Sequence, residues 1–326
     1  MTNNVTQQLS HDEWLKARSE VVTSTDISAI LGCHPRKTKL GLWIEKKEKT
    51  IESIEQNDAM EQGGFFEETI ANYIAHKNGL VIAKLDFISF PENHIGSSFD
   101  FKIIGVRPDS PYREMFEKHG TGILEVKKVR PSIFKDKWDE NNAPMNYEAQ
   151  VQYQMMVSGF KWCIIGVMVG LEKHACYLRE YKEWMGEKFK KEVKDFYQSI
   201  EDGIMPQIDY AKDGETLKKL FPESTGEAVS IDDDENYVNP LMKQYKDIVE
   251  GIEILEQQKE EITNRIKAFA GDASAVIGSF FKVSLTKSKD TPEKTMTIKP
   301  EDVGTTIVLS KGRKGGRPFR ATFKGE

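Results

Sequence analysis

The sequence predicts an α/β fold with a mixed central β-sheet flanked by helices, followed by a C-terminal helical, coiled-coil-like segment and a small β-rich appendage. Three observations predict this fold. Segments with helical periodicity alternate with short apolar stretches as far as residue 203. Residues 162–171 form a nearly unbroken apolar run, which is typical of a strand buried on both faces. From residue 241 to residue 269, apolar residues recur at alternating steps of four and three, as in a coiled coil.

The first part of the chain supplies the elements of the sheet and the helices around it. Helices are expected at 11–18, 27–31, 66–76, 147–158 and 182–203, and strands at 80–83, 95–104, 123–129, 162–171 and 177–181. Residues 23–26 offer N-cap side chains for the second helix. In the third helix we expect one buried face, formed by Phe66, Ile70, Tyr73 and Ile74.

Composition divides the chain into four parts. A main α/β domain occupies residues 1–205, and an acidic linker follows at residues 206–236. Residues 237–270 form the coiled-coil-like helical segment, and residues 271–326 form a small, β-rich and basic end. Alternating apolar residues predict strands in this last part at 280–285 and 305–309.

The bulk composition excludes several classes of protein. A hydrophobic fraction of 38% with 30% charged residues describes a soluble globular chain, and no apolar run reaches the roughly 18 residues of a membrane span. The first residues lack the basic and apolar regions of a signal peptide. Three cysteines give no disulfide framework, and the histidines are too scattered for zinc. We therefore expect a cytoplasmic protein, in the host cell cytoplasm if the chain is viral.

The chemistry of the chain is concentrated on one expected strand. Because side chains alternate along a strand, Glu125 and Lys127 share one face while Leu124 and Val126 anchor the other face in a core. An aspartate from a neighbouring strand, Asp100, would complete an acidic pocket with a lysine at its edge. Carboxylates bind hard cations such as Mg²⁺, and a lysine can orient or help deprotonate an attacking water. The pattern is typical of metal-dependent phosphodiester cleavage.

Several short motifs follow one another in a fixed order. They are Arg18, Thr25-Asp26, Ala29-Ile-Leu-Gly32, Gly63 with Glu67, Ser98-Phe-Asp100, Glu125-Val-Lys127, Trp138, Pro144 and Tyr147-Glu-Ala-Gln-Val-Gln-Tyr-Gln-Met. Over residues 11–200 this succession resembles the YqaJ-like viral recombinases. That family includes the lambda-type phage exonucleases and belongs to the PD-(D/E)xK superfamily, whose fold is restriction-endonuclease-like. The resemblance makes residues 1–205 a PD-(D/E)xK nuclease domain.

The resemblance implies a Mg²⁺-dependent enzyme, with Mn²⁺ able to substitute, that degrades one strand of duplex DNA from its 5′ end. Such enzymes leave a 3′ single strand for a single-strand annealing protein, and members form homo-oligomers. Asp100, Glu125 and Glu67 would bind the metals, and Lys127 would position the water. The family glutamine beside the active site corresponds to Gln150.

Residues for the DNA end follow from the same resemblance. Arg18 and Thr25 stand where family members hold the 5′ phosphate of the DNA. An Arg fork beside a hydroxyl suits a phosphate dianion. Gln154 lies one helical turn after Gln150 on the same face and is assigned to phosphate or DNA binding, whereas Gln152 points away.

Some assignments have rivals. Asp109 follows a proline and competes with Asp100, although Asp100 lies in the more strand-like run. Glu68 competes with Glu67 in the same way. Asp100 and Glu125 are 25 residues apart, more than in a compact hairpin.

Arg18 and the basic residues after Lys127 also have more than one interpretation. Arg18 has an alternative role as an ion-pair partner of Asp12 or Glu13 on its own helix. The basic residue that touches the DNA backbone after Lys127 is one of Lys128, Arg130 and Lys135.

The sequence therefore predicts a phage-type 5′→3′ double-strand DNA exonuclease that acts in recombination. Two alternatives stay open at this point. One is an endonuclease or structure-specific nuclease with the same fold, because one fold serves many activities. The other is a DNA-binding or interaction module without catalysis.

Overall fold

The structure is a computed structural model that describes residues 10–49, 58–170, 172–229, 231 and 237–285, and only the backbone of residues 58–63. The chain divides into two compact units, Met1–Leu220 and Phe221–Glu326. Within the described residues, no helix combines the length and the apolar composition that crossing a membrane requires.

A five-stranded mixed sheet forms the centre of the first unit, and its strands follow the order β1-β4-β5-β6-β7. These strands are β1 (Leu80–Lys84), β4 (Phe101–Val106), β5 (Gly122–Val129), β6 (Trp162–Val169) and β7 (Lys173–Glu180). The pair β5 and β6 is parallel, while the other neighbouring pairs are antiparallel. A separate two-stranded sheet pairs β2 (Ile88–Phe90) with β3 (Ile95–Ser97). The predicted mixed sheet flanked by helices is confirmed.

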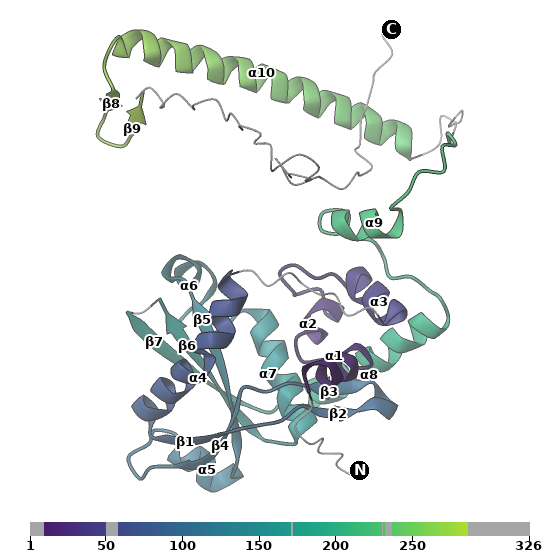
Figure 1. Cartoon of the computed structure of the whole chain (residues 1–326), viewed down its shortest axis with the longest axis vertical. Coiled ribbons are helices and arrows are strands. Elements are labelled where there is room, and N and C mark those ends of the chain that lie inside the picture. Colours follow the sequence, from purple (N-terminus) through teal and green to yellow (C-terminus); the bar gives the residue numbers. More distant parts are fainter. Residues whose placement is uncertain (1–9, 50–57, 171, 230, 232–236, 286–326) are drawn as a thin grey trace, which may run out of the picture. The chain divides into compact units, whose positions relative to one another are not determined.

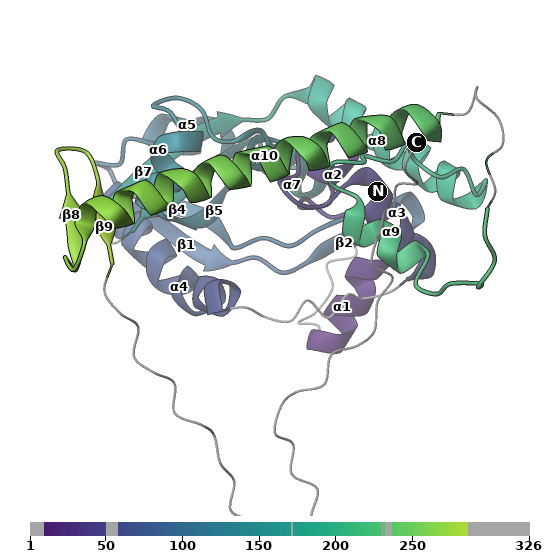
Figure 2. The ribbon, with the colours of Figure 1, turned by 90° about the horizontal axis from the view of Figure 1, so that it is seen from above.

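Helices lie on both faces of the sheet, with α4 (Asp58–Asn78) on one face and α7 (Met145–Ser158) on the other (Figure 1). The first unit also contains α1 (His11–Ser19), α2 (Ile27–Ile30), α3 (Lys39–Glu48), α5 (Arg113–His119), α6 (Pro131–Lys137), α8 (Glu183–Glu201) and α9 (Gly214–Leu220), with a 3₁₀ turn at Pro91–Asn93. In both views α1, α2 and α3 lie together, away from α4 and β1 (Figures 1 and 2).

The alternation along β5 and β6 divides the core into two layers. Leu124 and Val126 pack in a cluster with Ile74 of α4, whereas Ile123 and Val129 pack in the cluster that contains α2, α3, α7 and α8. Gly166 of β6 lets α4 approach, because a Cβ there would lie 3.1 Å from the Cγ2 atom of Ile74. Glu125 and Lys127 consequently face the α7 side of the sheet, as their spacing predicts.

Two expectations about local structure need correction. The predicted strand over 95–104 is two strands, because the chain bends at Ser98–Asp100 between β3 and β4. The buried face of α4 contains Ile70, Ala71, Ile74 and Ala75, while Phe66 and Tyr73 are 38% and 43% exposed. The apolar stripe is therefore narrower than expected, and its small residues bring the helix close to the sheet.

The first compact unit extends to Leu220, so it includes residues 206–220 as well as the predicted domain. The reason is a buried cap, in which the Thr38 hydroxyl donates to Asp213 and the Asp209 backbone N–H donates to the same carboxylate at 2.7 Å. The functional division of the chain into four parts stays a prediction.

The second unit contains a long helix and a hairpin. Helix α10 (Val238–Ala270) spans 33 residues and has no buried residue, so the apolar seam predicted from the sequence is exposed in this chain. The hairpin pairs β8 (Ala275–Ile277) with β9 (Lys282–Ser284). The strand expected at 305–309 lies outside the described residues.

Candidate active site

Asp100 and Glu125 are brought together by the pairing of β4 with β5. Phe101 pairs with Leu124, so the same antiparallel register places Asp100 opposite Glu125 one step before β4 begins. One oxygen of Asp100 accepts a hydrogen bond from the Val126 backbone N–H at 2.7 Å. The sheet itself thus holds the two predicted carboxylates side by side, although 25 residues separate them in the sequence.

Glu125 is 2% exposed and accepts hydrogen bonds from three side chains. Lys127 and Gln150 donate to its Oε1, the latter at 2.6 Å, and Gln154 donates to its Oε2 at 2.7 Å. Gln150 and Gln154 lie one turn apart on α7, as their spacing predicts. Gln152 points elsewhere, donating to the Glu180 carbonyl and accepting from the Lys182 N–H. The glutamines therefore fix both oxygens of the glutamate.

The electrostatics of the site are those of crowded carboxylates beside one ammonium. Burial, and after it the charge of the neighbouring Glu125 carboxylate, raise the pKa of Asp100 to about 7 against the opposing charge of Lys127. Burial lowers the pKa of Lys127, but the charges of Glu125 and Asp100 outweigh burial, so the net pKa is raised. Lys127 is therefore an ammonium beside the two carboxylates and can orient a water.

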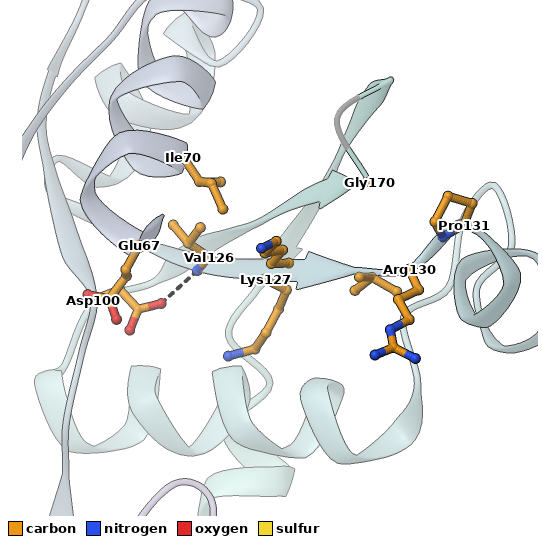
Figure 3. A pocket seen from close by; sticks show the side chains of 10 residues that line it. Glu67, Ile70, Asp100, Val126, Lys127, Arg130, Pro131 and Gly170 are labelled. Atoms are coloured by element: carbon orange, nitrogen blue, oxygen red, sulfur yellow. Dashed lines mark hydrogen bonds between the residues drawn. The ribbon is translucent and has the colours of Figure 1, made fainter. Parts of the chain in front are cut away.

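A cavity of about 400 Å³ opens beside these residues. Its lining includes Glu67, Asp100, Lys127 and Arg130. Asp100 and Glu67 lie together at one end of the cavity, and Arg130 lies at the other (Figure 3). Glu67 also makes an ion pair with Lys84 at 3.1 Å. The cavity is therefore acidic at one end and basic at the other.

The donor set can be compared with the needs of a divalent metal. Among the described residues, no three His, Cys, Asp or Glu side chains gather closely enough to hold a metal ion. The third predicted ligand, Glu67, stays a prediction. Asp100 and Glu125 nevertheless supply oxygen donors from adjacent strands, and after burial the charge of Glu125 is the next cause of the raised pKa of Asp100. Oxygen donors with excess negative charge fit a hard cation such as Mg²⁺.

Arg18 lies next to this carboxylate site. Its guanidinium stacks on Trp14, 4.5 Å from the ring centroid, and donates to the Ser98 hydroxyl at 3.2 Å. The carbonyl of Ser98 accepts from Gln154 at 3.2 Å, and Gln154 in turn bonds Glu125. The alternative partner Glu13 caps its own helix with Ser10. A continuous series of contacts therefore joins Arg18 to Glu125.

Ser98 belongs to the Ser98-Phe-Asp100 motif, but the sequence alone predicts no role for it. Its hydroxyl also accepts from the Trp14 indole N–H at 3.2 Å. The signal for Ser98 was its place two residues before Asp100, at the bend that precedes β4. Thr25, by contrast, is exposed in the turn before α2, and its carbonyl accepts from the Ser28 hydroxyl. The N-cap position of α2 is Asp26.

The rival candidates are placed differently. Asp109 is 76% exposed at its side chain and pairs with Arg107 at 3.3 Å. Glu68 is exposed, whereas Glu67 lines the cavity. Both placements favour the residues preferred from the sequence.

The three basic residues that could contact the DNA backbone after Lys127 differ in their position relative to the cavity. Lys128 and Arg130 line the cavity, and Lys135 does not. The Lys128 ammonium lies over the Phe66 ring at 4.5 Å.

The fold and the site define the class of this protein, an α/β domain of the nuclease type with an Asp…Glu-x-Lys site on two adjacent strands. Residues 13–161 match the family model of the YqaJ-like viral recombinase domain. The predicted resemblance to that family is therefore confirmed for this part of the chain.

The individual proteins that this chain resembles share less than a third of their residues with it. The chain is 27% identical over 281 residues to the protein YqaJ of Bacillus subtilis (strain 168), a match that covers 84% of this chain and 82% of that protein. A solved alkaline exonuclease, LHK-Exo from Laribacter hongkongensis, is 19% identical, with 64% of this chain and 99% of that chain covered and a TM-score of 0.45. A phage related exonuclease from Haemophilus somnus 129PT is 13% identical, with 56% and 95% covered and a TM-score of 0.42.

Proposed function

We propose that this chain is a divalent-metal-dependent DNA exonuclease that degrades one strand of linear duplex DNA from its 5′ end. The observation that carries this proposal is the series of contacts from Arg18 through Ser98 and Gln154 to Glu125. It puts a cation suited to a terminal phosphate next to a pair of carboxylates suited to a metal. An enzyme that binds a DNA end beside its cleavage site acts on ends and not on closed circles.

Each side chain has a defined role in this proposal. Asp100 and Glu125 would hold the metal, with Mg²⁺ preferred and Mn²⁺ as a substitute, and Glu67 would reach the same metal from α4. The bound ion would stabilise charge on the scissile phosphate and activate the attacking water. Gln150 and Gln154 fix the oxygens of Glu125, which keeps the carboxylate aligned through the reaction.

The Lys127 ammonium orients the water for in-line attack on phosphorus. The new bond joins the water oxygen to phosphorus, and the bond between phosphorus and the 3′ oxygen of the terminal nucleotide breaks. The leaving 3′ oxygen takes up a proton, and the released product is a 5′ mononucleotide. Because the water supplies the oxygen and the protons, no other reactant is needed.

Arg18 and Thr25 would hold the 5′ phosphate that defines the DNA end. The guanidinium of Arg18 offers several N–H donors, and the exposed hydroxyl of Thr25 lies in the turn that follows α1. This clamp favours an exonuclease over the endonuclease alternative, which needs no contact with a terminal phosphate.

The family of residues 13–161 supports a role in recombination. The 3′ single strands left by this activity would be substrates for a single-strand annealing protein, which we propose as the partner. We also propose that the protein acts as a homo-oligomer in the cytoplasm of a host cell.

One assay separates the proposed activity from its alternatives. Purified protein with Mg²⁺ is incubated with linear, nicked and closed circular duplexes that carry 5′-phosphate or 5′-hydroxyl ends. Degradation of linear DNA alone, faster from 5′ phosphates, is the expected result. Cutting of closed circles would identify an endonuclease, and binding without cutting would identify a non-catalytic module.

A variant tests the site itself. Lys127→Ala should fold and bind DNA but lose turnover. Lys118→Ala is the matched control, because Lys118 also pairs with a glutamate, Glu180, at 3.4 Å but lies outside the site. If Lys127→Ala digests DNA at the wild-type rate, the role of this lysine is wrong.

A further inference from the structure

A buried ion pair lies beneath the residues proposed to hold the 5′ phosphate. Asp26, at the start of α2, and Lys46, on α3, are 4% and 5% exposed, and the Lys46 Nζ lies 3.2 Å from Asp26 Oδ2. Neither side chain reaches the carboxylate site. Their other side-chain hydrogen bonds go to the two segments that carry Arg18 and Thr25 and to Lys37, which precedes α3.

The lysine holds the end of α1. Lys46 Nζ donates to the Arg18 carbonyl at 2.8 Å, which fixes the backbone of Arg18 in the last turn of its helix. The side chain of Arg18 then extends to Ser98 beside the active site. The position of the guanidinium therefore depends on the position of a buried ammonium 28 residues further along the chain.

The aspartate holds the turn that contains Thr25. Asp26 Oδ2 accepts from the Thr23 backbone N–H at 3.1 Å and from the Thr23 hydroxyl at 2.9 Å. These bonds close the turn of residues 23–26, and Thr25 lies exposed within it. One ion pair thus sets the positions of both proposed phosphate-binding residues relative to each other.

The charges around this pair favour an anion. Lys37 lies 3.5 Å from Asp26 and 2.6 Å from Glu45, so Arg18, Lys37 and Lys46 face two carboxylates. Burial opposes ionisation of Asp26, but Lys46, Lys37 and Arg18 outweigh it and hold the pKa of this carboxyl well below its usual range. Three basic side chains thus stand against two acidic ones around the turn that contains Thr25.

Stability alone is a weak reason for such a pair. Replacing a buried ion pair by apolar residues of similar volume is often neutral or stabilising, because desolvation offsets the attraction between the charges. A role in fixing geometry is a better-supported use of buried charges. Here the geometry that is fixed belongs to two residues on different segments of the proposed substrate site.

We infer that Asp26 and Lys46 are positioning residues that set the geometry of the 5′-phosphate site through the Arg18 carbonyl and the Thr23–Asp26 turn. This inference rests on the proposed exonuclease function. The pair touches neither the metal nor the scissile phosphate, so it governs recognition of the DNA end and not the chemical step.

The test compares two substrates that differ only at the end. For each protein, kcat and KM are measured on a linear duplex with a 5′ phosphate and on the same duplex with a 5′ hydroxyl. In Lys46→Met and in the double variant Asp26→Asn with Lys46→Met, we expect the ratio of the two kcat/KM values to fall about tenfold, the effect of one displaced charge-assisted hydrogen bond. The loss should appear as a higher KM for the 5′-phosphate duplex, with the 5′-hydroxyl reaction unchanged. Lys46→Arg should restore most of the ratio.

A control removes a comparable ion pair elsewhere. Arg179 pairs with Glu148 through several short contacts. The side chains of Arg179 and Glu148 are 18% and 20% exposed. Arg179→Met should lower the midpoint of thermal unfolding but keep the ratio, because a general loss of activity cancels between the two substrates.

The outcomes separate the inference from the proposed function. If wild-type protein does not cleave linear DNA, or cleaves both ends equally, the proposed function fails and the inference fails with it. If wild-type protein prefers 5′ phosphates and the double variant keeps that preference, the inference alone is overturned. The double variant removes both charges of the pair and so leaves neither of them buried without its partner. If Lys46→Met does not fold, the preference of the double variant for 5′ phosphates tests the inference. If neither variant folds, the pair is a stability element and the inference is overturned.

Discussion

The side chain of Gln154 is expected to control turnover without touching the substrate's reacting atoms. Its amide nitrogen donates to Glu125 Oε2 at 2.7 Å and to the Ser98 carbonyl at 3.2 Å, and the residue is fully buried. Gln154→Leu conserves much of the volume but removes both bonds. Glu125 then has no side-chain donor on Oε2, so the carboxylate is free to rotate out of alignment.

The magnitude follows from the kind of bond that is lost. A hydrogen bond to a charged group contributes about 1.5–3 kcal/mol. If that energy serves to align Glu125 in the transition state, kcat should fall by roughly ten- to a hundredfold. The assay is single-turnover cleavage of a linear 5′-phosphate duplex, with free energies of unfolding measured in parallel by guanidinium titration.

Gln152 provides a matched comparison on the same helix. It is 2% exposed and makes two hydrogen bonds of its own, to the Glu180 carbonyl and from the Lys182 N–H. Gln152→Leu should cost a similar free energy of unfolding and leave kcat within about twofold of wild type. The reasoning is refuted if the two variants lose turnover equally, or if Gln154→Leu cleaves at the wild-type rate.

Three other predictions follow from the charges of the first unit. Because the folded-state pKa of Asp26 is depressed, its stabilisation is present above the unfolded-state value of about 3.9 and is lost as pH falls. Asp26→Asn should therefore be less stable than wild type by about 3–5 kcal/mol at pH 7, and guanidinium titrations should find a smaller difference at pH 2. Asp100→Asn should abolish cleavage and Glu67→Gln should slow it, because both carboxylates are proposed metal ligands. Asp109→Asn and Glu68→Gln should retain cleavage. If Asp100→Asn and Asp109→Asn cleave DNA at equal rates, the assignment of Asp100 as the metal ligand is wrong. EDTA should stop cleavage and added Mg²⁺ should restore it, and Mg²⁺ should raise the thermal midpoint of wild type but not of Asp100→Asn.

The strands of the sheet could be predicted because their sequence patterns are local. Alternation along residues 123–129 and the apolar run from Trp162 depend only on which face each side chain occupies. The bend at Ser98–Asp100 could not be predicted, because apolar residues continue through it and only pairing with two different partners separates β3 from β4. Phe66 was expected in the core because it shares the stripe of Ile70, although the sheet lies under the small residues of α4.

In the candidate site, too, the residues that follow local sequence patterns could be predicted, and those that depend on long-range contacts could not. The shared face of Gln150 and Gln154 follows from helical spacing, whereas the structure alone gives their common hydrogen-bond partner, Glu125. The roles of Ser98 and Lys46 could not be read from the sequence, because each depends on contacts with segments that are distant along the chain. An isolated serine or lysine carries no periodic pattern that would indicate such contacts.

The pairing of Phe101 with Leu124 has a consequence for how this protein can vary. The ladder between β4 and β5 sets the separation of Asp100 and Glu125, so the length of the intervening loop and α5 is decoupled from the reaction centre. The exposed part of residues 107–121 can therefore vary in length while the two acids keep their spacing, provided that Tyr112, Met115 and Phe116 keep their packing against the core. This loop is the place where such a domain can acquire a new binding partner without losing its chemistry.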